Sequence, residues 1–364
     1  MIRYKYFIRG DAGMTDIAAI DKNFQIETKI KKDDIKFYSI DEAPFKIYGV
    51  YKDGGMYRRM PEDVAKSVSE GVHRLHTNTA GGRVRFVTDS PYVAVYAKVG
   101  TVSKLSFFSL TGIAGFDLYA GTLYMGTYIP PYKLSDEYEG VVELGSAEER
   151  EITVNFPSYS NVKEVYIGLS DGATLKEPSP YMNEKPIVYY GSSITQGACA
   201  SRPGMIYENI ISRKFNCDYV NLGFGGNAKA EDAMAEYVKN LDMSVFVYDY
   251  DHNAPNADYL EATHEKMFKT VRAANPDLPI ICMSRPRFRL VGEDSRRRSI
   301  VETTYKNALA AGDKNVYFLD GKALSALCGC DGMVEGTHPT DFGFASMAKA
   351  IGDVLEEIFE RGKI

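Results

Sequence analysis

The sequence predicts an α/β protein with two domains, an N-terminal β-sandwich (jelly-roll-like) domain and a C-terminal three-layer α/β/α domain. Two observations support this class. Up to about residue 175, short alternating strand patterns are separated by turns that contain Gly and Pro. From residue 187 onward, apolar runs alternate with helical patterns, as in a parallel sheet covered on both faces. We therefore expect the sandwich in residues 1–175, a linker in 176–186 and the α/β/α domain in 187–364.

Alternation of apolar and polar residues predicts the strands of the first domain. An Asp-Gly-Gly turn at 53–55 joins the strand pattern at 45–51 to the pattern at 56–58. The segment 170–186 is polar, contains three prolines and an Asp-Gly pair, and is typical of a linker. The remaining strands of this domain are expected at 83–87, 92–99, 104–110, 116–119, 151–156 and 163–169.

Short apolar runs bounded by breakers predict the parallel strands of the second domain. Helical faces separate these runs, one of them over 260–271 and one over 344–358 at the end of the chain. Ser201, with Pro203 two residues later, predicts a helix that Ser201 caps. The five expected strands are 187–190, 218–222, 244–249, 279–284 and 315–320.

Composition argues against several classes of protein. A net charge of −6 is unsuited to a general nucleic-acid binder, and no apolar run approaches the roughly 20 residues of a membrane helix. The N-terminus lacks the apolar core of a signal peptide, which predicts a cytoplasmic protein. The odd number of scattered cysteines is typical of a reduced protein. We expect no metal and no cofactor, since Cys328-Gly-Cys330 has no second ligand pair beside it.

The first strand of the second domain ends in a turn with two serines. Gly191 permits a sharp turn, and Ser192 and Ser193 follow it directly. Ligands of such domains bind outside the carboxyl ends of the strands. Either serine is therefore a candidate nucleophile.

Three more polar segments lie just after predicted strands or before the last helix. The segment 221–227 is rich in glycine, which lets backbone N–H groups approach a ligand. The segment 248–255 contains Asp, His and Asn, and the segment 335–341 contains His338 with a carboxylate three residues before it. A serine, a histidine and a carboxylate are the parts of a nucleophilic triad.

The block at 191–195, Gly-Ser-Ser-Ile-Thr, resembles the Gly-Asp-Ser-x-Thr block of the SGNH (GDSL-like) hydrolase superfamily, with serine in place of aspartate. The resemblance implies a flavodoxin-like catalytic domain and makes Ser193 the nucleophile. His338, in a Gly-x-His-Pro setting, matches the general base of the family. The acid of the family lies three residues earlier, at Glu335 here, and Asp331 is the reserve candidate.

The same resemblance implies an oxyanion hole, the group of donors that stabilises the developing negative charge. Gly226 matches the glycine of the second block and Asn253 the asparagine of the third. The donors would be the N–H groups of Ser193 and Gly226 and the side-chain amide of Asn253. Arg202 and His252 are candidate substrate contacts, and Arg202 would alternatively bind a structural carboxylate.

Residues 115–119, Gly-Phe-Asp-Leu-Tyr, resemble the Gly-x-Asp-Leu-Tyr motif of a subgroup that has its own N-terminal β domain. Members are taken to be esterases, several of which act on acetylated carbohydrates. The resemblance implies a serine esterase that removes acetyl groups from a small ester or an acetylated oligosaccharide. The alternatives are a lipase- or thioesterase-like acyl hydrolase and a catalytically inactive glycan-binding protein. The sequence is also compatible with assembly into a homo-oligomer.

Overall fold

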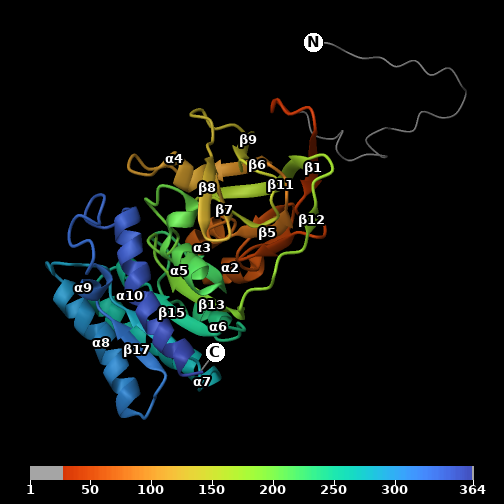
Figure 1. Ribbon diagram of the computed structural model, residues 1–364. Coiled ribbons are helices and arrows are strands. Elements are labelled where there is room, and N and C mark those ends of the chain that lie inside the picture. The colour runs from red at the N-terminus through yellow and green to blue at the C-terminus, as the bar shows by residue number, and fades with distance from the viewer. Residues whose placement is uncertain (1–27, 363–364) are drawn as a thin grey trace, which may run out of the picture.

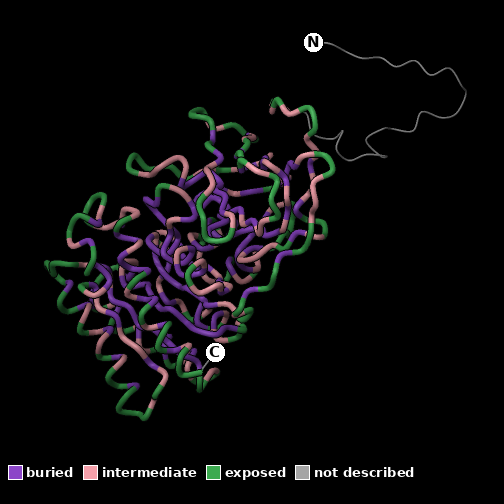
Figure 2. The backbone as a smooth tube through the Cα atoms, viewed as in Figure 1, coloured by how far each residue is buried: buried purple, intermediate pink, exposed green. Residues whose placement is uncertain are grey.

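The computed structural model describes residues 28–362, which form a β-rich domain beside an α/β domain (Figure 1). The β-rich domain has two antiparallel sheets that enclose one apolar core. The α/β domain has a parallel sheet with helices on both faces. The predicted fold class is confirmed. Buried backbone runs through the centre of both domains, and exposed backbone lies mainly on outer helices and loops (Figure 2).

The two sheets of the N-terminal domain pack face to face. The first contains, in spatial order, β1 (Ile35–Ser39), β11 (Ser160–Ser170), β6 (Tyr92–Val102) and β9 (Glu137–Glu143). The second contains β12 (Leu175–Lys176), β5 (Arg83–Thr88), β10 (Arg150–Asn155), β7 (Phe116–Ala120) and β8 (Leu123–Tyr128), with β2 (Lys46–Tyr48) also paired with β5. A separate hairpin joins β3 (Tyr51–Asp53) to β4 (Met56–Arg58).

The prediction of a strand at 104–110 is wrong. The structure has a loop there, which leads into the short helix α4 (Leu110–Ala114). Phe107 and Phe108 of this loop pack against one another rather than alternating across a sheet. Strands β1, β8 and β9 were not predicted from the sequence.

Two short helices of the N-terminal half, α2 (Glu62–Val68) and α3 (Glu70–Leu75), were also not predicted. Their buried residues Ala65, Val72 and Leu75 belong to the apolar core of the α/β domain, where they join side chains such as Tyr190 and Phe224. Six or seven residues give too little periodicity to distinguish a helix from other structure.

The parallel sheet has the strand order 2-1-3-4-5 of the flavodoxin-like class. Its strands, in that spatial order, are β14 (Cys217–Gly223), β13 (Asn183–Gly191), β15 (Val245–Asp249), β16 (Ile280–Met283) and β17 (Val316–Leu319). One face is covered by α6 (Asp232–Val238), α7 (Ala257–Ala274) and α8 (Asp294–Ala310). The other is covered by α5 (Tyr207–Phe215), α9 (Gly321–Leu324) and α10 (Asp341–Glu360).

The helix after the first strand begins later than expected. Ser201 does not cap it, because the 3-10 turn η2 (Pro203–Met205) and the extended residue Ile206 come before α5. The hydroxyl and N–H groups of Ser201 instead donate hydrogen bonds to Asp341, at 2.5 and 2.8 Å. This joins the segment after the first strand to the start of α10.

The segment expected as a linker is partly built into the sheets. At its start Lys176 lies in β12, which pairs with β5, and at its end β13 begins at Asn183. A domain division at 176–186 stays a prediction. Helices α2 and α3 precede this division in the sequence but pack in the core of the α/β domain that follows it.

Buried arginines join the two domains. Arg59 donates hydrogen bonds to the carbonyl oxygens of Asn221 and Gly223, at 3.1 and 2.7 Å, and lies over the ring of Phe224. Arg83 forms an ion pair with Asp218. A buried arginine left without its partners would be strongly destabilising, so these contacts fix how the β-rich domain sits on the edge of the parallel sheet.

Candidate active site

A tight turn at the end of β13 presents Ser193. Gly191 is required there, because a Cβ atom would lie 2.1 Å from the Thr195 hydroxyl oxygen and 2.4 Å from the Asp249 carbonyl oxygen. Ser192 is fully buried, and its hydroxyl oxygen accepts the Ile194 N–H at 3.1 Å. Ser193 is only partly buried. The two serines therefore differ, since Ser192 holds the turn and Ser193 faces the surface of the site.

Three side chains form a connected chain at this position. The Ser193 hydroxyl lies 2.8 Å from Nε2 of His338. Nδ1 of the same imidazole contacts Oε1 of Glu335, which also accepts the His338 N–H at 3.0 Å. In this arrangement the carboxylate orients the ring, and the ring can accept a proton from the hydroxyl.

The structure separates the two candidate acids. Asp331 is exposed, and in the described residues its side chain makes no contact with His338. It lies in the loop before the bridge that pairs Met333 with Pro339. The geometry brings Glu335, and not Asp331, to the imidazole.

Cys199 lies near Glu335 and the loop that contains Phe107. Its thiol donates to the carbonyl oxygen of Phe107 at 3.6 Å. Burial, and secondly the charge of Glu335, raises the pKa of Cys199 to about 12. The thiol is therefore protonated at neutral pH and unsuited to act as a nucleophile.

Three potential donors for an oxyanion are Ser193 itself, Gly226 in the loop after β14 and Asn253 in the loop after β15. The N–H groups of Ser193 and Gly226 have no acceptor among residues 28–362. Gly226 has φ = +73°, a conformation that favours glycine. The Asn253 amide donates one hydrogen to the Phe224 carbonyl oxygen at 2.9 Å, which leaves its second hydrogen for a ligand. By contrast, the N–H group of Gly225 is already bound to Gln196.

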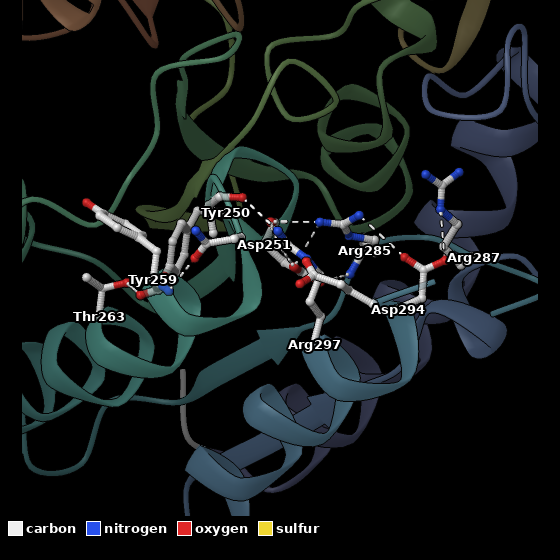
Figure 3. A network of polar contacts seen from close by, with 11 residues as sticks. Tyr250, Asp251, Tyr259, Thr263, Arg285, Arg287, Asp294 and Arg297 are labelled. Carbon is white, nitrogen blue, oxygen red and sulfur yellow. Dashed lines mark hydrogen bonds and ion pairs between the residues drawn. The ribbon is translucent and has the colours of Figure 1, made fainter. Parts of the chain in front are cut away.

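A charged network holds the loop that contains Asn253. Asp251 lies between Arg285 and Arg297 (Figure 3). Arg297 donates to a carboxylate oxygen of Asp251 at 3.0 Å and to the Ala254 carbonyl oxygen at 2.9 Å. Arg285 is also within 3.4 Å of Asp294. The loop after β15 is thus fixed from the side of α8.

This network corrects one interpretation of the sequence. Their composition alone favours a solvated face for the arginine runs at 285–289 and 296–298, and a helix start for the second, which does lie at the start of α8. Arg297 is instead only 4% exposed, and Arg285 and Arg287 both lie near the buried Asp294. Arg285 and Arg297 therefore hold the loop of the site and do not belong to a solvated face.

His252 lies between Asp251 and Asn253 and close to His338. Burial lowers the pKa of His252 well below its usual value, and the positive charges of Arg285 and Arg287 lower it further. The ring is therefore neutral. Its Nε2 atom is buried and has no hydrogen-bond partner among the described residues.

Arg202 points to the N-terminal domain. It donates to the carboxylate of Asp117 at 3.0 Å and to the Tyr119 hydroxyl. Asp117 also accepts the Gly204 N–H at 2.7 Å. Of the two roles expected for Arg202, the structure shows the contact with a structural carboxylate, so we do not retain it as a substrate contact.

The Gly-x-Asp-Leu-Tyr motif thereby gains a physical explanation. A Cβ atom at Gly115 would lie 2.5 Å from the Thr111 carbonyl oxygen. Asp117 is fully buried, and burial raises its pKa, while Asn155 and Arg202 oppose the shift. Leu118 packs in the sandwich core. The motif binds the segment that follows Ser193 to the β-rich domain.

Three aromatic residues of the β-rich domain reach the site and were missed from the sequence. Phe107 stacks on the His338 ring at 5.5 Å between centroids, and Phe108 meets the same ring edge-on at 6.2 Å. The Tyr159 hydroxyl donates to the Ser193 carbonyl oxygen at 3.2 Å. The two adjacent phenylalanines are the available sequence signal, but the local pattern around them, at 104–110, predicts a strand.

Tyr57 and Tyr92, two aromatic residues of the first domain, are not available to stack on a glycan. Tyr57 is fully buried and Tyr92 is 2% exposed. Both hydroxyl groups bind aspartates within the sandwich, Asp41 and Asp34 respectively. Neither ring can stack on a sugar.

Residues 28–362 contain neither a metal-binding cluster nor a helix suited to span a membrane. No group of three or more His, Cys, Asp or Glu side chains has an arrangement that could hold a metal ion. None of the helices in this part of the chain combines the length and apolar character that crossing a membrane requires.

Both the β-rich and the α/β part of the chain match known protein families. Residues 184–356 match the GDSL-like Lipase/Acylhydrolase family, and residues 35–175 match the GxDLY domain, the N-terminus of SGNH-hydrolase-type esterases. No curated protein matches the chain significantly. A solved structure from Bacteroides ovatus, described as a GDSL-like lipase, is 28% identical, with a TM-score of 0.79; the match covers 90% of this chain and 98% of that one.

Two further solved structures share the fold. Salicylyl-acyltransferase SsfX3 from a tetracycline biosynthetic pathway is 21% identical, with a TM-score of 0.73 and coverage of 90% of this chain and 98% of that one. Acetyl xylan esterase Est2A from Butyrivibrio proteoclasticus is 12% identical, with a TM-score of 0.57 and coverage of 91% and 99%.

The fold and the family matches together define an ester hydrolase. Residues 184–356 belong to the GDSL-like lipase/acylhydrolase family of SGNH hydrolases, and residues 35–175 form the GxDLY domain found at the N-terminus of SGNH-hydrolase-type esterases.

Proposed function

We propose that this esterase removes acetyl groups from O-acetylated carbohydrate, with Ser193 as nucleophile, His338 as general base and Glu335 as acid. The observation that supports the proposal most is the continuous contact from the Ser193 hydroxyl through His338 to Glu335. The hydroxyl attacks the ester carbonyl as its proton passes to Nε2 of His338. The imidazolium then returns the proton to the leaving alcohol.

The oxyanion of the tetrahedral intermediate would be held by the N–H groups of Ser193 and Gly226 and by the free amide hydrogen of Asn253. Donors that are already in place when the charge develops need no reorganisation during the reaction. The two arginines around Asp251 support this, because they fix the loop that carries Asn253. Water then attacks the acyl-enzyme and releases the acid.

The aromatic residues support a carbohydrate as the alcohol part of the ester. His338 donates its proton to the leaving alcohol, so that alcohol lies on the His338 side of the acyl group. Phe107 stacks there and is 36% exposed. An exposed ring beside the leaving group offers the apolar face on which a sugar ring can stack. His252, with its free Nε2, would accept or donate a hydrogen bond to a sugar hydroxyl.

The test compares Phe107→Ala with the wild type on two kinds of acetyl ester. For acetylated xylo-oligosaccharide we expect KM to rise about ten-fold, because about 1.4 kcal/mol of stacking is lost. Hydrolysis of p-nitrophenyl acetate should change less than about three-fold, since its small alcohol depends less on a sugar-binding surface. Leu123→Ala, an exposed apolar residue of β8, serves as the matched control.

A p-nitrophenyl series of acetate, butyrate and octanoate belongs to the same experiment. Turnover that falls with chain length supports an acetylesterase. A preference for octanoate would contradict it and favour a lipase- or thioesterase-like enzyme. Equal effects of Phe107→Ala on both acetyl esters would remove the argument for a sugar at this ring.

Asn253→Ala tests the oxyanion hole. Loss of one preorganised donor typically lowers kcat by about 10²–10³-fold, or about 2.7–4 kcal/mol of transition-state stabilisation. We expect kcat to fall in this range with little change in KM, because the donor acts mainly in the transition state. Steady-state kinetics with p-nitrophenyl acetate measures both constants. An unchanged kcat would mean that Asn253 only holds the loop through the Phe224 carbonyl oxygen.

A further inference from the structure

A second cavity lies where the two domains meet, and none of the proposed catalytic residues lines it. It is formed by β5, β10 and the turn after β7 on one side, and by α5 and the segment before β13 on the other. Its volume is about 280 Å³, which corresponds to roughly nine water molecules at about 30 Å³ each. This suits a small polar ligand, not an oligosaccharide.

Two buried polar atoms of the cavity lining have no partner among the described residues. Arg85 is 3% exposed, and one of its terminal nitrogens pairs with Glu151 at 3.1 Å, but Nη1 is buried and unbound. Asn155 is 1% exposed and donates to Asp117, while its Oδ1 atom is likewise unbound. Buried polar atoms usually have partners, and a charged donor left alone is especially unfavourable.

The charges around the cavity are mainly positive. Arg83, Arg85 and Arg213 line it, and Glu151 is the only carboxylate among the lining residues. Arg83 is neutralised by Asp218 and Arg85 by Glu151. Arg213 forms no ion pair among residues 28–362; it donates to the Gly204 carbonyl oxygen at 2.7 Å and stacks over Tyr119. One positive charge therefore remains uncompensated.

We propose that this cavity binds a small oxyanion that also carries a hydroxyl group, such as hydrogen phosphate or a short hydroxycarboxylate. The anionic oxygens accept from Nη1 of Arg85 and from Arg213, and the hydroxyl donates to Oδ1 of Asn155. A carboxylate or phosphate group suits the planar donors of arginine. The hydroxyl distinguishes this ligand from a simple anion, because the unpaired buried atom of Asn155, Oδ1, is an acceptor.

The ligand would also join the two domains. Arg213 holds Gly204 through its carbonyl oxygen, and Asp117 holds the Gly204 N–H while it accepts from Asn155. A ligand bound to Arg213 and Asn155 would thus contact one residue of the α/β domain and one of the β-rich domain. Both residues belong to the hydrogen-bond network that anchors Gly204, in the segment after Ser193. A ligand that binds the folded chain and not the unfolded chain raises the unfolding temperature by mass action.

The experiment uses the full chain in calorimetric titrations and thermal unfolding at constant ionic strength. The probes are phosphate, glycolate, acetate and chloride. For wild type we expect saturable binding of phosphate or glycolate with a Kd below about 1 mM. Acetate, which lacks the hydroxyl, should bind at least about five-fold more weakly than glycolate. Chloride should give no saturable signal.

Two variants test the location of the binding. Arg213→Gln should weaken binding at least ten-fold, since a charge-assisted hydrogen bond is lost. Asn216→Asp places a carboxylate in the lining and should weaken it similarly; its left-handed backbone (φ = +46°) tolerates aspartate. Arg296→Gln removes an exposed charge that pairs with Asp258 and Glu261, and it should bind like wild type.

Hydrolysis of p-nitrophenyl acetate serves as the check that each variant is folded. If Arg213→Gln does not fold, the location of the binding site is tested with Asn216→Asp alone. The proposal is overturned if wild type binds none of the oxyanions below about 10 mM. It is also overturned if acetate equals glycolate, or if the folded cavity variants bind as wild type does.

Discussion

Ser193→Ala is expected to lower kcat for p-nitrophenyl acetate by at least about 10⁴-fold. The hydroxyl is the group that forms the acyl-enzyme, and loss of a triad nucleophile leaves only the assistance of the oxyanion hole and of binding. His338 and Glu335 would remain in place but would have no hydroxyl to activate. Burst kinetics and labelling with a fluorophosphonate probe measure the loss directly, and the variant should not be labelled.

Ser192→Ala is the matched control, because it removes the neighbouring hydroxyl. That hydroxyl accepts the Ile194 N–H inside the turn, so we expect a loss of about 1 kcal/mol in stability. Activity should stay within about ten-fold of wild type, and labelling should persist. Wild-type turnover by Ser193→Ala would refute the nucleophile assignment, and an unlabelled wild type would make an inactive glycan-binding protein the better interpretation.

Glu335→Gln is expected to lower kcat by as much as about 10⁴-fold, the loss known for a triad whose acid becomes an amide. The glutamine no longer stabilises the imidazolium, and its amide can force the ring into the wrong tautomer. Thermal stability should change little, because Glu335 lies in a partly exposed loop with a side-chain exposure of 36%. The measurement is kcat/KM over a range of pH, with circular dichroism to confirm the fold.

Asp331→Asn is the control for this second prediction. It removes one negative charge from the same loop, at a residue that makes no contact with His338 in the described structure. We expect less than a three-fold change in kcat/KM, since an exposed charge at a distance acts weakly. A larger loss in Asp331→Asn than in Glu335→Gln would reverse the choice of acid.

The pattern of the sequence was sufficient to predict the second domain and the position of its site. All five parallel strands were expected, because strands buried on both faces are nearly continuous apolar runs such as that at 187–190. Ser193, Gly226, Asn253 and His338 follow strands or precede the last helix. The carboxyl ends of parallel strands meet at one edge of a sheet, so these residues were expected to lie together.

Contacts between residues far apart in the sequence could not be predicted in this way. Arg297 lies in a run of three arginines that is typical of an exposed helix, yet it is buried because Asp251 compensates its charge. Phe107 belongs to a segment whose local pattern indicates a strand. Its place beside His338 depends on how the β-rich domain packs on the parallel sheet.

The sequence by itself determined the fold class, the ester hydrolase family and the candidate triad, because local periodicity and short motifs encode strands, helices and reactive turns. The tertiary structure alone decided that Glu335 reaches His338, that Arg202 binds Asp117, and that aromatic side chains of the first domain line the site. Each of these depends on the distance between segments that the chain brings together only on folding. Packing and charge compensation set that distance, and neither has a local sequence pattern.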